Sequence, residues 1–437
     1  MTMRQVDFPY HDSTRALHLP EERLKAVLTS AIAETAPLPD PAGAVLEALR
    51  NPIGTPPLRE LAKGKKRVLI VTSDHTRPVP SKLTLPVLTG EILLGEPRAE
   101  ITILVATGLH RATTRDEQLE KFGREIVERF PIVVHDAFDA ESCVPVCTLP
   151  SGADFEVNRL ALETDLLITE GFIEPHFFAG YSGGRKSILP GICSYVTVVE
   201  NHSAKAIAHP QSRGGVLEGN IIHEDMIYAA KQVDVAFTLN VALNAKKEIV
   251  GAFAGELDAS HLEGTRFVDR LSRVPAVEGD VVFTSNGGLP LDQNLYQCPK
   301  AASTALECLR PGGVLVIVAS CCDGLGGEHF AQLMTAGTPR EIYDRILATP
   351  PRETIPEQWC AQTFAQILLE HPIVVVSDFL DPETVRAVNM IPARTPDEAL
   401  ELALGLTGPE AEVVAIPDGV SVIAVRETTK TGGASHG

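Results

Sequence analysis

The sequence predicts an α/β protein with two domains, each built on a mostly parallel sheet flanked by helices. Apolar, β-branched runs at residues 66–72, 100–106 and 164–169 have the composition of buried parallel strands. Segments with helical spacing separate these runs, and strands joined by crossovers of this length form parallel sheets. A second pattern of the same kind begins near residue 279. Two domains follow because 437 residues are too many for one ordinary core.

The expected elements follow from the hydrophobic periodicity along the chain. In the first domain, helices are expected at residues 21–33, 41–49, 83–94 and 115–129, and strands at 66–72, 100–106, 131–135 and 164–169. In the second domain, a helix is expected at 292–309, and strands at 280–284, 314–318, 373–377 and 415–425, the last interrupted at residues 417–419. We expect residues 1–274 to form the first domain, 275–427 the second, and the small, polar residues 428–437 a disordered tail.

The composition argues against several classes of protein. The net charge is -19 and there is no basic stripe, which disfavours a nucleic-acid partner, because neutralising phosphates needs clustered Lys and Arg. No apolar run reaches the roughly 18 residues of a membrane span, and the N-terminus lacks the apolar region of a secretory signal. The eight cysteines are scattered, which indicates small buried side chains in a reducing compartment. We therefore expect a cytoplasmic protein without a membrane partner.

Three polar motifs follow the carboxyl ends of predicted strands, the edge where open α/β sheets bind ligands. The first, at residues 73–78, contains Arg77, whose forked and permanently charged group suits a phosphate or a carboxylate. The second is Thr-Gly-Leu-His-Arg with His110, and the third strand leads to His176. Imidazoles at such an edge suit proton transfer near neutral pH. Taken singly, these motifs also fit structural roles, namely a capped turn with a surface ion pair and satisfied structural histidines.

Further polar residues lie in glycine-rich and helix-start segments. The loop at residues 179–187 is no P-loop, because Arg185 stands between Gly184 and Lys186. Lys186 is either an exposed loop residue or a covalent attachment point or nucleophile. His202 is a lone candidate ligand, so either no metal binds or a cofactor brings the other donors. Residues 292–300 suit binding of a carboxylate at a helix start, or form an ordinary helix surface.

In their order and spacing, these motifs resemble the nickel-pincer lactate racemase family over residues 60–425. The resemblance implies a covalent cofactor, the Ni(II)-pyridinium-3,5-bisthiocarboxylate mononucleotide, joined to Lys186 as a thioamide, with His202 as the protein ligand of nickel. It implies that the cofactor phosphate and nearby groups contact the residues that follow the first strand, namely Asp74, His75, Thr76 and Arg77.

The same resemblance implies a reaction and its remaining residues. His110 and His176 become an acid/base pair, and the substrate contacts Arg77, Gln297, Lys300 and Trp359. The expected enzyme is a racemase or epimerase of a 2-hydroxy acid such as lactate. It works by proton-coupled hydride transfer through a 2-keto acid, in a cleft between the two domains. The expected partners are the small-molecule substrate and the proteins that make the cofactor.

Two alternatives stay open at this point. One is a zinc hydrolase that uses His110, His176 and His202 as three ligands of the metal. The other is a non-catalytic protein that binds or stores the same nickel-pincer cofactor. An acid/base histidine pair and the Lys300 clamp argue against storage, because storage needs neither.

Overall fold

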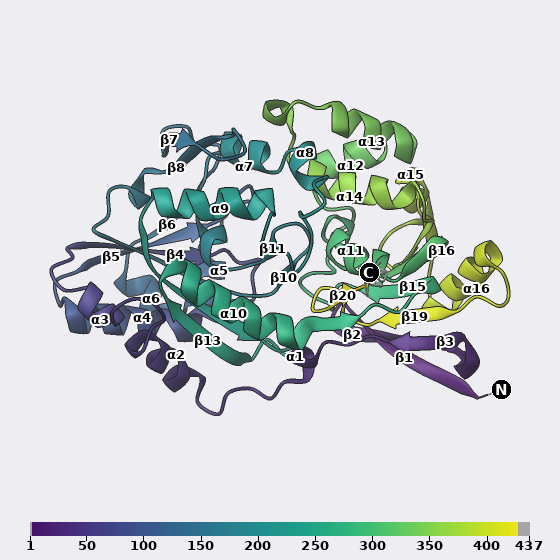
Figure 1. The fold of residues 1–437 in the computed structure, drawn as a ribbon, viewed down its shortest axis with the longest axis horizontal. Helices are drawn as coiled ribbons and strands as arrows, with labels where there is room; N and C mark the ends of the chain where they lie inside the picture. Colours follow the sequence, from purple (N-terminus) through teal and green to yellow (C-terminus); the bar gives the residue numbers. More distant parts are fainter. Residues whose placement is uncertain (1, 427–437) are drawn as a thin grey trace, which may run out of the picture. The chain divides into compact units, whose positions relative to one another are not determined.

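The computed structural model describes residues 2–426, and the predicted tail at 428–437 lies outside the described residues. The chain folds into two compact units (Figure 1). Of the described residues, the larger unit comprises Ala31–Leu271 and Glu341–Gln362, and the smaller unit comprises 2–30, 272–340 and 363–426. This differs from a single break after residue 274, because the first 30 residues pack with the second sheet and a later segment packs with the first.

The larger unit is built on a six-stranded sheet in the order β13-β12-β9-β4-β5-β6. All neighbours in it are parallel except β12 and β13. From edge to edge the strands are Ile249–Gly255, Val235–Leu243, Leu166–Phe172, Arg67–Ser73, Glu100–Ala106 and Ile132–Val134. Two short hairpins accompany the sheet, β7 (Cys143–Thr148) with β8 (Asp154–Asn158), and β10 (Pro175–His176) with β11 (Gly180–Tyr181).

Helices surround this sheet and its hairpins (Figure 1). They are α1 Ala31–Glu34, α2 Pro41–Arg50, α3 Leu58–Leu61, α4 Ser81–Gly95, α5 Arg115–Phe122, α6 Arg124–Arg129, α7 Tyr195–Asn201, α8 Ala204–Ile207, α9 Ile221–Gln232 and α10 Leu257–Ser272. Ile70, Ile103 and Ile168 of the central strands are fully buried and pack in one core with apolar residues of α2 and α4. Burying this continuous apolar face is what drives the strand runs together.

The smaller unit has a wholly parallel six-stranded sheet in the order β18-β17-β16-β15-β19-β3. Its strands are Ile391–Ala393, Ile373–Val376, Leu309–Val318, Gly279–Ser285, Val413–Ile416 and Leu24–Val27. The hairpin of β1 (Met3–Tyr10) and β2 (Ser13–Pro20) adds Phe8 and Leu17 to its core. The remaining elements of this unit are α11 Pro299–Leu306, α12 Glu328–Met334, α15 Pro382–Ala387, α16 Pro396–Thr407, and the parallel pair β14 (Arg273–Pro275) and β20 (Ile423–Val425). Most of α13 (Pro339–Ala348) and the start of α14 (Gln358–Leu368) belong to the larger unit.

Most predicted elements are present, but four differ. The strand predicted at 415–425 is two strands in different sheets, β19 and β20. The helix predicted at residues 21–33 is wrong: a 3-10 turn leads into β3, which pairs with β19 at the sheet edge. The helix predicted at 115–129 breaks into α5 and α6 at Gly123, whose φ of 81° no continuous helix tolerates. The helix predicted at 292–309 begins only at Pro299, because the preceding backbone pairs with residues 323–325 instead.

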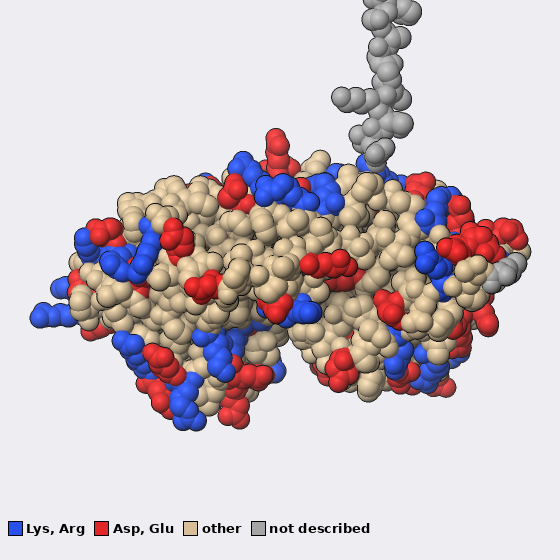
Figure 2. Space-filling model, turned by 90° about the horizontal axis from the view of Figure 1, so that it is seen from below, with Lys and Arg blue, Asp and Glu red and all other residues tan. Residues whose placement is uncertain are grey.

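The described residues carry surface charges of both signs, and their cysteines form no disulfides. In the face shown in Figure 2, acidic and basic side chains are interspersed among the described residues. Six of the eight cysteines are buried and all are unbridged. No helix within residues 2–426 combines the length and the hydropathy needed to cross a membrane.

Candidate functional site

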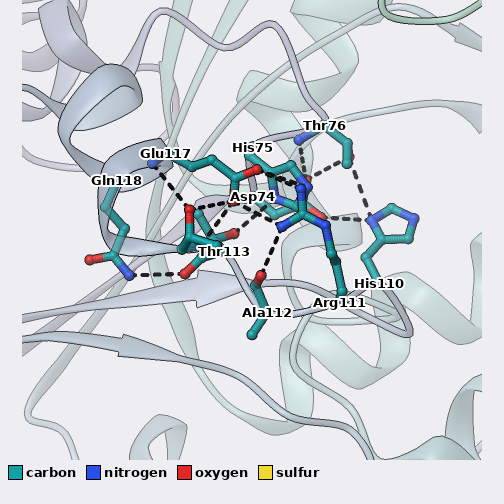
Figure 3. A network of polar contacts seen from close by, with 10 residues as sticks. Asp74, His75, Thr76, His110, Arg111, Ala112, Thr113, Glu117 and Gln118 are labelled. Carbon is teal, nitrogen blue, oxygen red and sulfur yellow. Dashed lines mark hydrogen bonds and ion pairs between the residues drawn. The ribbon is translucent and has the colours of Figure 1, made fainter. Parts of the chain in front are cut away.

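An aspartate–histidine pair stands at the carboxyl ends of two neighbouring strands. Asp74 follows β4 and His110 lies in the turn after β5, and the two strands are paired up to Ser73 and Ala106. The Nδ1 atom of His110 lies 2.6 Å from Oδ2 of Asp74 (Figure 3). The other carboxylate oxygen accepts the Thr76 hydroxyl at 2.6 Å and its backbone N–H at 3.0 Å. Both oxygens of Asp74 are thus occupied, and Nε2 of His110 is left to face a second partner.

The charge of this pair follows from its surroundings. Burial by itself raises the pKa of Asp74, which is 1% exposed. The hydrogen bond from His110, the charges of His110 and Arg77, and the Thr76 hydroxyl outweigh burial and hold the pKa well below its usual range. An ionised carboxylate only accepts hydrogen bonds, so Nδ1 of His110 carries a proton and donates. In the form of the ring that carries only this one proton, Nε2 presents a lone pair, as a general base requires.

The residues around this pair are cross-linked by further polar contacts (Figure 3). His75 Nδ1 lies 3.1 Å from the Thr113 hydroxyl, and burial lowers the pKa of His75. Arg111 pairs with both oxygens of Glu117, at 2.9 and 2.5 Å, and Glu117 also caps α5 through Thr114. The Arg111 hydrogen bonds lower the pKa of Glu117 to about 2. These contacts fix the turns after β4 and β5 relative to each other.

Two ionisable side chains near the site, one buried and one half-buried, were not predicted as functional residues. Glu170 of β9 is fully buried and accepts hydroxyl groups from Thr72 of β4 and from Ser81 and Thr84 of α4, the last at 2.5 Å. Lys121 of α5 donates to the Arg77 carbonyl at 2.7 Å, and burial lowers the pKa of this lysine. An acidic residue inside an otherwise apolar strand was the available signal for Glu170.

The glycine-rich loop is held from within by Arg185. This side chain is fully buried and donates to the carbonyl groups of Ala179 at 2.8 Å, Gly183 at 3.1 Å and Ser182 at 3.3 Å. Its Nε also donates to Nδ1 of His223 at 3.0 Å, and burial lowers the pKa of Arg185 to about 9. Burial and the Arg185 charge lower the pKa of His223 to about 3, so this ring is a neutral acceptor.

The loop needs glycine at position 183. Gly183 has a φ of 83°, and a Cβ atom there would lie 2.7 Å from Oδ1 of Asn240 and 2.8 Å from the Phe172 carbonyl. The same Asn240 oxygen accepts the Gly184 N–H at 2.9 Å. Arg185 and Lys186 are neighbours in the chain, but their side chains have different environments. Arg185 is buried inside the loop, whereas Lys186 lies beside an aromatic ring.

Lys186 lies in an aromatic cluster that contains Phe178 and three other predicted residues, His176, His202 and Trp359. The amine of Lys186 lies 5.5 Å from the Phe178 ring centroid. The rings of His176 and His202 lie edge-on to the same ring, with centroid distances of 4.5 and 5.0 Å. The ring centroid of Trp359 also lies 5.0 Å from that of His202. The sequence placed these residues in one site, and the structure gathers them within the larger unit.

His202 is suited to be a metal ligand. It is 4% exposed, and its Nδ1 atom has no hydrogen-bond partner among the described residues. Burial, and next the charge of Lys186, lower the pKa of His202 to about 3, so the ring is neutral near pH 7. A buried imidazole nitrogen without a partner is costly unless something binds it. Beside a lysine amine, it fits a covalently attached group that brings its own metal.

The three-histidine zinc site has no geometric support. Within residues 2–426, no group of three or more His, Cys, Asp or Glu side chains is arranged to hold a metal ion. His110 is engaged by Asp74, whereas His176 and His202 contact Phe178. The zinc hydrolase alternative is therefore wrong for this arrangement.

The remaining predicted residues lie in both units. Gln297 ends a 3-10 turn and Lys300 is the second residue of α11, and both belong to the smaller unit. Trp359 was expected in the second domain but belongs to the larger unit. It lies in the first turn of α14 and is 8% exposed.

The family models and the relatives that match this chain all belong to one family. The lactate racemase N-terminal domain matches residues 10–215, and the lactate racemase C-terminal domain matches residues 274–424. The lactate racemase of Thermoanaerobacterium thermosaccharolyticum is 47% identical over 426 residues, which cover 97% of this chain and 100% of the relative. The lactate racemase of Lactiplantibacillus plantarum is 45% identical over 422 residues, covering 96% and 100%.

A solved structure agrees with these likenesses. The lactate racemase apoprotein from Thermoanaerobacterium thermosaccharolyticum matches with a TM-score of 0.93 at 46% identity, covering 97% of this chain and 100% of that chain. The fold and the likenesses define an isomerase on a two-unit α/β scaffold, which confirms the predicted fold and enzyme classes. The chain belongs to the lactate racemase family.

Proposed function

We propose that this chain interconverts the two enantiomers of a 2-hydroxy acid, with lactate as the first candidate. The names of its relatives support lactate, and the Asp74–His110 pair supports a reaction in which a proton moves. A base that is oriented by a buried carboxylate serves proton transfer and has no use in storage. This pair therefore favours catalysis over a protein that only binds the cofactor.

Lys186 and His202 are the residues that we assign to the cofactor. Lys186 would carry a nickel-pincer nucleotide as a thioamide at Nζ, and His202 would give nickel its protein ligand. When bound, this group supplies a hydride acceptor, which the side chains of the chain itself do not provide. We assign His75, Thr76 and Arg77 to its phosphate and nearby groups. Asp74 is better assigned to His110, because both its oxygens are engaged and a carboxylate repels a phosphate.

The two histidines handle the substrate hydroxyl proton. Nε2 of His110 accepts this proton from one enantiomer while Asp74 keeps Nδ1 protonated, and the carbon skeleton passes through a planar 2-keto acid. His176 serves the other enantiomer in the same way. We assign the substrate carboxylate to Arg77, Gln297 and Lys300, and a wall of the pocket to Trp359. Maturation of the enzyme would require the proteins that make the cofactor.

Racemisation in heavy water tests this mechanism. Enzyme reconstituted with the cofactor pathway is given L-lactate in D₂O, and the product is resolved by chiral chromatography and examined by NMR. Transfer as hydride predicts D-lactate that keeps protium at C2, because the hydrogen never exchanges with solvent. Deuterium at C2 would refute the hydride route. Enzyme that carries the adduct on Lys186 yet racemises none of a panel of 2-hydroxy acids would refute the function.

A further inference from the structure

A segment from the second half of the chain forms part of the histidine-bearing unit. Residues 341–362 belong to the larger unit, whereas the chain on both sides of them belongs to the smaller one. We call residues 351–362 the strap; they include a 3-10 turn, Pro351–Glu353, and the first residues of α14. The strap lies against α7 and α8, the helices on either side of His202.

Polar contacts attach the strap on both sides of His202. Arg352 Nε donates to Oε1 of Glu200 at 2.7 Å, and its Nη2 pairs with Asp154. The other oxygen of Glu200 accepts the Asp154 N–H at 2.7 Å, so the arginine joins a network that includes β8. Beyond His202, Nε2 of Gln362 donates to the Ala204 carbonyl at 2.9 Å. Because the two ends of the strap are attached at Glu200 and Ala204, the middle of the strap lies opposite His202.

Trp359 occupies that middle position. Its ring centroid lies 5.0 Å from that of His202, with an interplanar angle of 63°. Phe178 contacts the imidazole at 5.0 Å and 83°. Two aromatic rings therefore limit how His202 can rotate, and one of them is carried by the strap.

The docked strap also buries polar groups at a cost. Thr354 Oγ1 and Gln358 Nε2 are buried and have no hydrogen-bond partner among the described residues. Burying such groups without a partner opposes docking. Arg352 works in the other direction, because undocking would leave the buried carboxylate of Glu200 without its cation.

We propose that Arg352 is a positioning residue that holds the strap down and thereby keeps the Trp359 ring against His202. Its guanidinium contacts Glu200 and Asp154, and it acts on His202 through the strap. The inference rests on the proposed function in one respect, the role of His202 as the nickel ligand. The docking of the strap itself needs no cofactor and can be measured in the unloaded protein.

Trp359 is the only tryptophan of the chain, so its fluorescence reports on the strap directly. In unloaded protein, Arg352→Met should shift the emission to longer wavelength and raise the acrylamide quenching constant about twofold, as expected for loss of one partly exposed ion pair. Glu200→Gln should give the same shift, and the double variant no more than either. Arg310→Met is the matched control, because Arg310 bridges Asp280 and Glu412 in the smaller unit. It should leave the emission unchanged.

The second measurement concerns nickel in the loaded protein. In Arg352→Met, a chelator should remove nickel several-fold faster, while the adduct mass on Lys186 stays unchanged and Arg352→Lys recovers part of the loss. Unchanged emission and quenching in a folded Arg352→Met protein would overturn the proposal, as would an exposed Trp359 with an unchanged rate of nickel release. A wild-type protein that never takes up nickel would refute the proposed function and the ligand role of His202, while the fluorescence of unloaded protein would still decide the docking of the strap.

Discussion

Replacing Asp74 by asparagine isolates the charge of the aspartate–histidine pair while nearly keeping its shape. The bond between Asp74 Oδ2 and His110 Nδ1 is 2.6 Å long and nearly fully buried on the carboxylate side. Hydrogen bonds to charged groups contribute about 1.5–3 kcal/mol, which corresponds to a loss of roughly 10- to 150-fold in rate. An amide N–H facing Nδ1 would also favour the tautomer with its proton on Nε2, which cannot accept. We therefore expect kcat to fall by about two orders of magnitude, with little change in KM.

Chiral chromatography of lactate, started from each enantiomer, measures this loss. The values of kcat/KM should fall equally in both directions, because enantiomers have the same free energy. Asp165→Asn is the matched control: Asp165 precedes β9 and accepts the backbone N–H groups of Lys66 and Arg67 at the opposite end of β4. An Asp74→Asn enzyme that is folded, loaded with cofactor and within about threefold of wild-type kcat would refute the reasoning.

The Asp74→Asn substitution should also change how the stability of the folded protein depends on pH. Because the pKa of Asp74 is lowered in the folded protein, its carboxylate adds stability above the ordinary carboxyl pKa of about 4. This stability is lost as the pH falls below that value. The gap in thermal midpoint between wild type and Asp74→Asn should therefore narrow from pH 6 towards about pH 3. A gap that widens on acidification would contradict the assigned charge.

Three further predictions concern the loop and its histidines. Lys186→Ala should abolish the cofactor adduct in intact-mass spectra, whereas His202→Ala should keep the adduct and lose nickel in metal analysis; an adduct on Lys186→Ala would contradict the tether. Arg185→Met leaves three loop carbonyls without their donor, so we expect a loss of roughly 3 kcal/mol or more and a thermal midpoint lower by at least about 6 °C; an unchanged midpoint would argue against the clamp. Burial, and next the charge of Arg185, lower the pKa of His223 in the folded protein. As the pH falls, the unfolded chain therefore takes up a proton at this histidine before the folded protein does. The stability of the folded protein should fall below about pH 6.5, by about 2 kcal/mol at pH 5. Urea midpoints of His223→Gln should depend less on pH between 7 and 5 than those of wild type, and an equal dependence would contradict this.

The sequence alone determined the central strands and the edge at which the site stands. Continuous β-branched runs that end at polar residues have few stable arrangements other than buried parallel strands, and β4, β5 and β9 are strands of one sheet. Because the carboxyl ends of parallel strands meet at one edge, motifs far apart in the chain could be assigned to one site. His110, His176, Lys186 and His202 could be chosen as candidates because their motifs, in this order, resemble a known family.

Tertiary structure decided which partner each of these side chains has. Asp74 was expected among the residues that contact the cofactor phosphate and nearby groups, and in the structure it engages His110, 36 residues away. Arg185 broke a familiar loop pattern in the sequence, and only the folded loop reveals that it donates inward to three carbonyls. The edge strand β3 forms where a helix was predicted, because pairing with β19 outweighs a weak local preference. Periodicity records which face of a segment is buried, but partners for a buried charge or an edge strand come from distant segments, and no local pattern encodes them.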